Sequence, residues 1–248
     1  MKSKVALITG AGSGIGRAVS IALLDQGYQV ALTGRKASKL EQTKKMSRQQ
    51  ANALVIPADV TNPHDVEMLF QSITDQFRRL DLVFNNAGIN ITGPLEDITP
   101  MQWRSVIDTN LTGAFLCTQQ AFKIMKNLKP QGGRIINNGS ISAYVPRPES
   151  AAYTCSKHAI TGLTRSTSLE GRKYNICCGQ IDIGNVETQM AQRMKTGTLQ
   201  ADGRLQIEPT FDLQHVVDAV LYMASLPLEA NVQFMTVMAS MMPFIGRG

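Results

Sequence analysis

Short apolar, β-branched runs alternate along the chain with longer stretches in which apolar residues recur at helical spacing. The apolar runs predict seven strands, over Val5–Thr9, Gln29–Gly34, Ala53–Pro57, Leu82–Asn85, Gly133–Gly139, Asn175–Ile183 and Val232–Met238. The amphipathic stretches predict six helices, over Gly14–Gln26, Lys36–Gln50, Pro63–Arg79, Pro100–Lys126, Ser150–Glu170 and Asp212–Ser225. Because this alternation is typical of βαβ units, we expect an α/β fold with a doubly wound parallel sheet and helices on both faces.

The chain has 248 residues, of which 43% are hydrophobic and 18% charged, so we expect one domain over residues 1–248. The least regular stretch, residues 190–211, contains two glycines and a proline, and we expect it to cover a substrate site. Residues 232–248 are expected to form a last strand and a methionine-rich tail. Its methionines and Phe244 are expected in core or subunit-interface packing rather than in a substrate pocket.

Charge and cysteine content exclude several classes of function. Lys and Arg outnumber Asp and Glu by 25 to 19, but they are scattered, so we expect an anionic small molecule rather than nucleic acid as partner. The four cysteines and three histidines have no metal-ligand spacing, which predicts no metal site and indicates reduced thiols in the cytoplasm. No apolar run reaches the roughly 20 residues of a membrane span, so no membrane association is expected.

A glycine-rich turn joins the first strand to the first helix, with GxxxGxG spacing over residues 10–16. Glycines let the backbone approach a pyrophosphate, and the helix N-terminus offers unpaired N–H groups to it. A tight turn that binds nothing is the alternative from local chemistry. The candidate cofactor contacts in this turn are Gly10, Ser13, Gly14, Ile15 and Gly16.

The end of the second strand bears on the choice of dinucleotide. Gly34 occupies about the position at which an acidic residue would bind the adenosine ribose of NAD, and Arg35 and Lys36 follow it. Without a carboxylate there, a phosphate is not repelled, and Arg35 can pair with one in fork geometry. The sequence therefore favours NADP(H) over NAD(H), with a merely solvated Arg35 as the alternative.

Candidate acid/base chemistry lies in the helix predicted over Ser150–Glu170. Tyr153 and Lys157 are four residues apart and so share one helix face. A neighbouring ammonium stabilises a phenolate and makes the phenol a usable acid/base near neutral pH. Ser140 lies at the end of the fifth predicted strand, thirteen positions before Tyr153; the GxSxG spacing of a hydrolase elbow is not present around it.

Taken together, these elements resemble the short-chain dehydrogenases/reductases of the single-domain kind, from about Lys4 to Leu226. The motifs that carry the resemblance are Thr9–Gly16, Asn85–Gly88, Asn110, Ser140, Tyr153 and Lys157. The resemblance implies a single-domain Rossmann fold. It also implies, as in NADP-dependent ketoreductases such as 3-oxoacyl-ACP reductase, reversible hydride transfer between NADP(H) and a ketone or secondary alcohol.

The resemblance assigns roles to individual residues. Tyr153 would exchange the proton with the substrate oxygen, Ser140 would hydrogen-bond that oxygen, and Lys157 would hold the nicotinamide ribose and lower the pKa of Tyr153. Asn110 would anchor a water in a proton relay. The further cofactor contacts implied are Asp59, Val60, Asn86, Ala87 and Gly88 for the adenine half, and Gly184, Val186 and Thr188 for the nicotinamide half. For Asp59, local chemistry fits a turn residue equally well.

The resemblance also bears on the class of substrate and on the oligomeric state. By resemblance the pocket is lined by mostly apolar residues, which favours a neutral hydrophobic ketone; the candidates are Ile141, Ser142, Val145, Pro146, Met190, Met194 and Phe211. The resemblance also implies a homotetramer or homodimer, packed through the helices predicted over Pro100–Lys126 and Ser150–Glu170. A non-catalytic NADP-binding sensor or assembly protein with the same fold is the alternative function.

Overall fold

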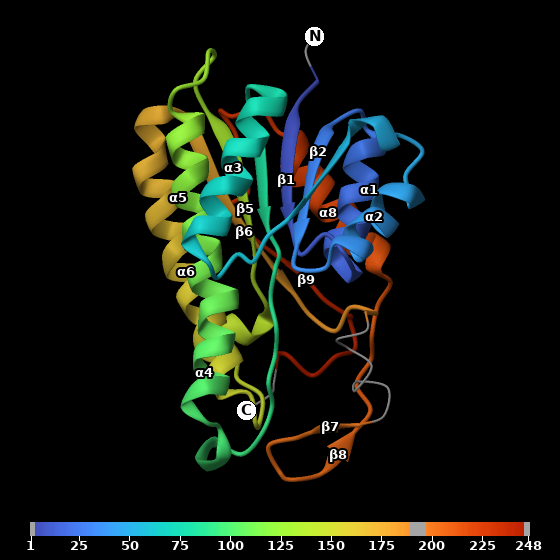
Figure 1. Ribbon diagram of the computed structural model, residues 1–248. Coiled ribbons are helices and arrows are strands. Elements are labelled where there is room, and N and C mark those ends of the chain that lie inside the picture. The colour runs from blue at the N-terminus through green and yellow to red at the C-terminus, as the bar shows by residue number, and fades with distance from the viewer. Residues whose placement is uncertain (1–2, 189–196, 246–248) are drawn as a thin grey trace.

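The seven predicted strands form one parallel sheet in the computed structural model, which describes residues 3–188 and 197–245 (Figure 1). The strands are β1 (Val5–Thr9), β2 (Gln29–Gly34), β3 (Ala53–Pro57), β4 (Leu82–Asn85), β5 (Gly133–Asn138), β6 (Ile176–Ile183) and β9 (Phe234–Val237). Their order across the sheet is β3-β2-β1-β4-β5-β6-β9. The chain therefore winds outward in one direction from β1 and in the other from β4, and a crevice forms between the carboxyl ends of these two strands.

Helices cover both faces of the sheet, which confirms the predicted doubly wound α/β architecture (Figure 1). On one face lie α1 (Gly14–Asp25), α2 (Ala37–Met46) and α8 (Leu213–Ser225), and on the other α3 (Pro63–Phe77), α5 (Gly113–Met125) and α6 (Ala151–Gly171). A further helix, α4 (Pro100–Ile107), extends beyond the carboxyl ends of the strands.

The two faces have separate cores because side chains alternate along each strand. In β1, Ala6 and Ile8 belong to a cluster with the apolar residues of α1 and α8. Val5 and Leu7 point the other way, into a cluster with residues of α3 and α5. All four side chains are fully buried, so β1 lies in the middle of the molecule and holds the loop that follows it in a fixed place.

The range predicted as one helix, Pro100–Lys126, is helical in the structure, but it contains a π-helical turn that was not predicted. α4 ends at Ile107, and Asp108–Thr112 form a single π-helical turn before α5 begins. The extra residue in such a turn directs a side chain that a regular helix would place elsewhere. Here Asn110 is buried and hydrogen-bonds the main chain of Ile89, so local bonding overrides the helical repeat.

The other boundaries differ by a few residues, mostly at helix ends. Arg78 adopts a left-handed conformation that ends α3, and Asn175 adopts one just before β6. The last strand is shorter than predicted and begins at Phe234. At α8, Asp212 is the N-cap, as its residue type indicates, and its carboxylate accepts from Gln214 N–H.

The predicted covering segment is described from residue 197 onward. It contains a short hairpin, β7 (Thr198–Leu199) and β8 (Leu205–Gln206), beyond the carboxyl ends of the strands (Figure 1). The segment then returns to the sheet through a bridge between Val186 and Phe211. None of the helices in the described ranges is long and apolar enough to cross a membrane.

Candidate active site

A cavity of about 290 Å³ opens at the carboxyl ends of the strands and brings most of the predicted site residues together. Its lining includes the predicted residues Gly10, Ser13, Gly14, Ile15, Asn86, Ala87, Gly88, Ser140, Tyr153, Lys157, Gly184, Val186 and Thr188. These residues come from the turns after β1, β4, β5 and β6 and from α6. The predicted residues outside this lining are Gly16, Arg35, Asp59, Val60 and Asn110.

The glycine-rich turn has the backbone shape that its sequence indicates. Gly10 and Gly14 have φ values of 67° and 50°, in the left-handed region that side chains other than glycine rarely adopt. Gly16, in the first turn of α1, lies so close to the glycine-rich turn that an added Cβ would overlap the carbonyl oxygen of Gly10. Ser13, the N-cap of α1, makes no side-chain capping bond, so it leaves the first N–H groups of the helix to other acceptors. The turn therefore has the geometry of an anion cradle.

The turn after β4 is fixed to β1 by Thr9. The Thr9 hydroxyl accepts from the main-chain N–H groups of Asn86 (2.8 Å) and Ala87 (2.9 Å), and the Asn86 amide donates to the Thr9 carbonyl (2.8 Å). These bonds close the crevice between β1 and β4 from behind. Thr9 was expected only as part of a motif. In the structure its hydroxyl holds the end of β1 and the turn after β4 together, and both of these border the cavity.

Basic side chains gather beside the glycine-rich turn at the end of β2. Arg35, Lys36 and Lys39 are all exposed there. Lys39 lies against the turn, because a Cβ added to Gly12 would come 3.0 Å from the Lys39 Cβ. A phosphate bound beside this strand end would face these three cations.

Two further predicted adenine contacts have structural roles of their own. Asp59 follows β3, and its Oδ1 accepts from the N–H (3.0 Å) and hydroxyl (2.9 Å) of Thr61, the bonding of a turn aspartate. Val60 is buried in the core beside Gly113, where an added Cβ would come 2.8 Å from Val60 Cγ2. Their contact with a cofactor stays a prediction.

Ser140 and Tyr153 are neighbours in the cavity wall. Ser140 is the N-cap of a 3₁₀ turn, and its hydroxyl accepts from Ser142 N–H at 3.1 Å. Burial raises the pKa of Tyr153, while the hydrogen bond with Ser140 and the charge of Arg147 lower it. Burial wins, so the pKa of Tyr153 stays raised here, opposite in direction to the lowering expected from Lys157.

Lys157 lies one helical turn from Tyr153 and points into the same cavity. Its Nζ donates to the carbonyl of Asn138 (2.6 Å) and lies 5.5 Å from the centroid of the Tyr153 ring. Burial lowers the pKa of Lys157 to about 8, against an opposing influence of the Asp182 carboxylate. The ammonium therefore stays mostly protonated at neutral pH but loses its proton at a much lower pH than an ordinary lysine does.

Asn110 lies behind the cavity wall, in the π-helical turn. Its Oδ1 accepts from Ile89 N–H (2.8 Å), and its Nδ2 donates to the Ile89 carbonyl (3.0 Å) and to the Ser156 hydroxyl (3.0 Å). The residue thus ties the loop after β4 to α6. Its predicted water relay stays a prediction.

The pocket is more polar than expected. Ile141 and Ser142 line it, but Val145 and Pro146 do not, and Asn90, Arg147 and Asn185 are present instead. Phe211 packs with core residues beside the cavity. The candidates Met190 and Met194 lie outside the described residues.

Sequence reasoning did not identify several polar residues around the pocket. Arg147 donates to Glu208 (2.6 Å) and Asn185 (2.8 Å), and so connects the loop after β5 to the segment after β8. Asp182 on β6 accepts from Ser140 N–H (3.0 Å). These residues come from distant parts of the chain, and the only local signal was a carboxylate in an otherwise buried strand.

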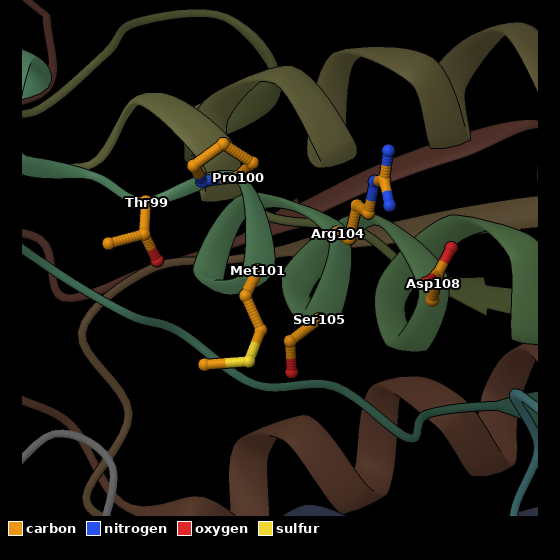
Figure 2. A pocket seen from close by; sticks show the side chains of 6 residues that line it. All are labelled: Thr99, Pro100, Met101, Arg104, Ser105 and Asp108. Atoms are coloured by element: carbon orange, nitrogen blue, oxygen red, sulfur yellow. The ribbon is translucent and has the colours of Figure 1, made fainter.

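A second depression lies on α4 and its flanks, lined by Thr99, Pro100, Met101, Arg104, Ser105 and Asp108 (Figure 2). It is built from a single helix, and Met101 is 78% exposed there. None of the predicted acid/base residues contributes to it. Within residues 3–188 and 197–245, His, Cys, Asp and Glu form no group that could hold a metal ion. The cavity at the carboxyl ends of the strands is therefore the candidate active site.

Comparison with known proteins shows the family of this chain. A family model described as short chain dehydrogenase matches residues 4–198. An uncharacterized oxidoreductase of Staphylococcus aureus (strain USA300) is 33% identical over 237 residues, which cover 96% of this chain and 97% of the relative.

Solved structures have the same fold. A short chain dehydrogenase from Bacillus anthracis is similar with a TM-score of 0.81 and 30% identity over 94% of each chain. The 3-ketoacyl-(acyl-carrier-protein) reductase from Brucella melitensis, complexed with NADH, has a TM-score of 0.84 at 24% identity, with 96% of this chain and 98% of that chain covered.

Proposed function

Because the chain belongs to the short-chain dehydrogenase family of oxidoreductases, we propose that it interconverts a ketone and a secondary alcohol by hydride transfer, with NADP(H) as the cofactor. The observation that carries this proposal is the meeting of Ser140, Tyr153 and Lys157 in one cavity beside the glycine-rich turn. Carbonyl reduction requires a proton donor and a hydrogen-bond donor for the substrate oxygen beside the bound dinucleotide. The two hydroxyls and the ammonium of these residues can supply those groups.

The glycine-rich turn and the donor groups of the cavity support the binding of a dinucleotide. The left-handed Gly10 and Gly14 leave room for a pyrophosphate at the N-terminus of α1. Asn86, Ala87 and Gly88 line the same crevice, and so does Thr188, which lies beside Gly14 and is proposed to bind the nicotinamide carboxamide. When bound, the reduced cofactor supplies the hydride.

The preference for NADP(H) rests on the end of β2. Gly34 carries no carboxylate that would repel a phosphate, and Arg35, Lys36 and Lys39 are exposed beside it. The Brucella reductase carries NADH, so the preference is argued from these residues of this chain. Arg35→Asp should weaken NADPH binding and improve NADH binding. An unchanged ratio of the two dissociation constants would overturn the assignment.

The protein residues divide the chemistry among them. Tyr153 donates the proton to the substrate oxygen, and Ser140 hydrogen-bonds that oxygen and stabilises the charge that develops on it. The ammonium of Lys157 stabilises the phenolate that Tyr153 becomes, and it also holds the nicotinamide ribose. Asn110 keeps the loop after β4 against α6, through its bonds to Ile89 and Ser156.

The test is NADPH oxidation with a panel of ketones and acyl thioesters, comparing wild type with Tyr153→Phe. We expect Tyr153→Phe to lose at least about 100-fold in kcat, in keeping with the typical contribution of a general acid. The matched control is Tyr222→Phe, on the exposed side of α8, which should keep wild-type turnover. Activity that survives Tyr153→Phe would remove Tyr153 from the mechanism.

The same panel separates the enzyme from a non-catalytic sensor or assembly protein. Tight NADPH binding without turnover of any carbonyl would favour the sensor. The polar lining by Asn90, Arg147 and Asn185 supports a ketone that carries a hydrogen-bonding group of its own. We further propose that the protein acts in the cytoplasm as a homotetramer or homodimer.

A further inference from the structure

A buried carboxylate lies directly behind Ser140. Asp182, on β6, is 0% exposed. Its Oδ1 accepts from Ser140 N–H (3.0 Å) and from the Gln180 amide (2.7 Å), and its Oδ2 accepts from the Tyr144 hydroxyl (2.7 Å). A buried carboxylate is costly unless hydrogen-bond donors satisfy it, so three donors at this one indicate that the fold is built to hold its charge.

The surrounding chain is built to hold this carboxylate. Gly139 allows its approach, because an added Cβ there would overlap Asp182 Oδ1. The Gln180 amide is fixed by two threonines: Thr164 donates to its carbonyl oxygen (3.0 Å), and its nitrogen donates to the Thr161 hydroxyl (3.1 Å). The amide nitrogen is thereby turned toward Asp182. The carboxylate is thus tied to both β6 and α6.

The charge of Asp182 reaches the acid/base pair. It raises the pKa of Lys157, against the larger lowering caused by burial, and it adds a small increase to the burial-raised pKa of Tyr153. The charged or titratable groups that interact with it are Tyr153 and Lys157 on α6 and Tyr144 in the loop after β5. Arg165 acts on Tyr144, and Arg147 acts on Tyr153. From β9, the Thr236 hydroxyl bonds Tyr144.

We propose that Asp182 is a positioning residue for the hydride-transfer site: its carboxylate fixes the main chain of Ser140 and places a buried negative charge behind the acid/base residues. This inference rests on the proposed function. Asp182 does not line the cavity, so it acts through Ser140 and Lys157 rather than on the substrate.

The test is Asp182→Asn, which keeps the side-chain shape and removes the charge. Without the anion, the pKa of Lys157 falls below about 8 and the pKa of Tyr153 falls with it, so both lose their protons at lower pH. We expect the alkaline loss of ketone reduction to start about one pH unit lower than in wild type. At pH 8, kcat should fall about fivefold while the KM for the ketone changes less than about twofold.

The control is Asp218→Asn, which removes an exposed carboxylate from α8 and should leave the pH profile as in wild type. A folded Asp182→Asn protein with the wild-type alkaline limb and kcat overturns the proposal. Melting temperatures of both variants show whether the fold is kept.

A readout without substrate separates this proposal from the proposed function. The phenolate absorbance of Tyr153 is titrated as the difference between each protein and its Tyr153→Phe form. The midpoint should be lower in Asp182→Asn than in the Asp182 parent, even if no ketone is turned over. An unchanged midpoint contradicts the proposed charge effect, whether or not the protein is a ketoreductase.

Tyr144→Phe provides the test if Asp182→Asn does not fold. It removes one donor from Asp182 but keeps the charge and the ring that packs on Phe244. Burial raises the pKa of Asp182, and the Tyr144 hydrogen bond lowers it, so the variant should raise it further. Activity should then be lost on the acidic side at a higher pH than in wild type. An acidic limb that does not move contradicts the need for an anionic Asp182.

Discussion

At the scale of single residues, the buried charge of Lys157 lowers the stability of the folded protein at the place where the proposed reaction needs an ammonium. Its ammonium is buried, and burial lowers its pKa from 10.5 to about 8. The folded protein therefore binds this proton less tightly than the unfolded chain does. Below about pH 8 the full cost of burying the charge is present, and between about pH 8 and 10.5 the cost is progressively removed as the pH rises.

Replacing Lys157 by methionine should therefore stabilise the protein while abolishing reduction. The pKa difference corresponds to a destabilisation of about 3 kcal/mol at pH 7, which the variant removes. Loss of the hydrogen bond to the Asn138 carbonyl destabilises the variant by about 1–2 kcal/mol and offsets part of this gain. We expect the free energy of unfolding to rise by about 1–2 kcal/mol, measured in urea at pH 7. It should also depend less on pH between about 8 and 10.5 than in wild type. A Lys157→Met protein less stable than wild type would contradict this account.

Residue chemistry could be predicted from sequence where it depends on local spacing. Tyr153 and Lys157 share a helix turn, and the left-handed Gly10 and Gly14 follow from a glycine-rich junction. Asp182 could not be found in this way, because its meaning comes from Ser140, 42 positions away in sequence. A strand sequence shows a carboxylate but not the donors that neighbouring strands and helices bring to it.

At the scale of elements, the π-helical turn is a device for placing one amide. Asn110 satisfies both main-chain groups of Ile89 and the hydroxyl of Ser156. Asn110→Ala leaves these three groups without that partner, so we expect it to destabilise the protein by about 3 kcal/mol. The control is Asn127→Ala, an exposed amide that bonds the Lys123 carbonyl, which should cost less than about 0.5 kcal/mol. Equal midpoints in urea for both variants would show that the turn needs no amide.

A second element-scale prediction concerns the segment after β8. Glu208 is 2% exposed and accepts from Arg147 (2.6 Å), Asn185 (2.7 Å) and Gln200 (3.0 Å). Glu208→Gln removes the negative charge opposite Arg147 and should loosen this attachment. We expect faster amide hydrogen exchange in residues 198–211 and a several-fold higher KM for the ketone, with NADPH affinity within about twofold of wild type.

The control for this prediction lies in the same hairpin. Asp202 pairs with Arg204, and both are exposed, so Asp202→Asn should change neither exchange nor KM. A Glu208→Gln protein that behaves like Asp202→Asn would show that the segment is held in place without the ion pair.

The boundaries of an element could be predicted where a buried apolar run or a polar or turn residue sets them. β1 to β4 begin and end as the apolar runs predict, because each is bounded by polar or turn residues. The helix predicted over Pro100–Lys126 is present, but its π-helical turn could not be predicted, since the apolar period continues through that turn. The hairpin of β7 and β8 carries little apolar pattern and was expected only as an irregular segment.

At the scale of the whole molecule, the candidate active site and the surface predicted for subunit contacts lie on different sides. The cavity lies at the carboxyl ends of the strands, whereas the outer faces of α5 and α6 point away from the sheet on one side (Figure 1). Phe115 on α5 is 46% exposed and Leu169 on α6 is 62% exposed. Exposed apolar groups on adjacent helices are typical of subunit contacts. The predicted assembly through these helices would leave the cavity open.

We therefore expect sedimentation of a homotetramer or homodimer at micromolar concentration, and a smaller species for Phe115→Glu combined with Leu169→Glu. The charges would have to be buried without partners in the contact, which costs several kcal/mol. Tyr222→Glu is the matched control, because Tyr222 is a comparably exposed ring (54%) on α8, across the sheet from α5 and α6. It should sediment as wild type does. A wild-type protein that sediments as a monomer would contradict the assembly, and a double variant that keeps the wild-type size would place the contact elsewhere on the surface.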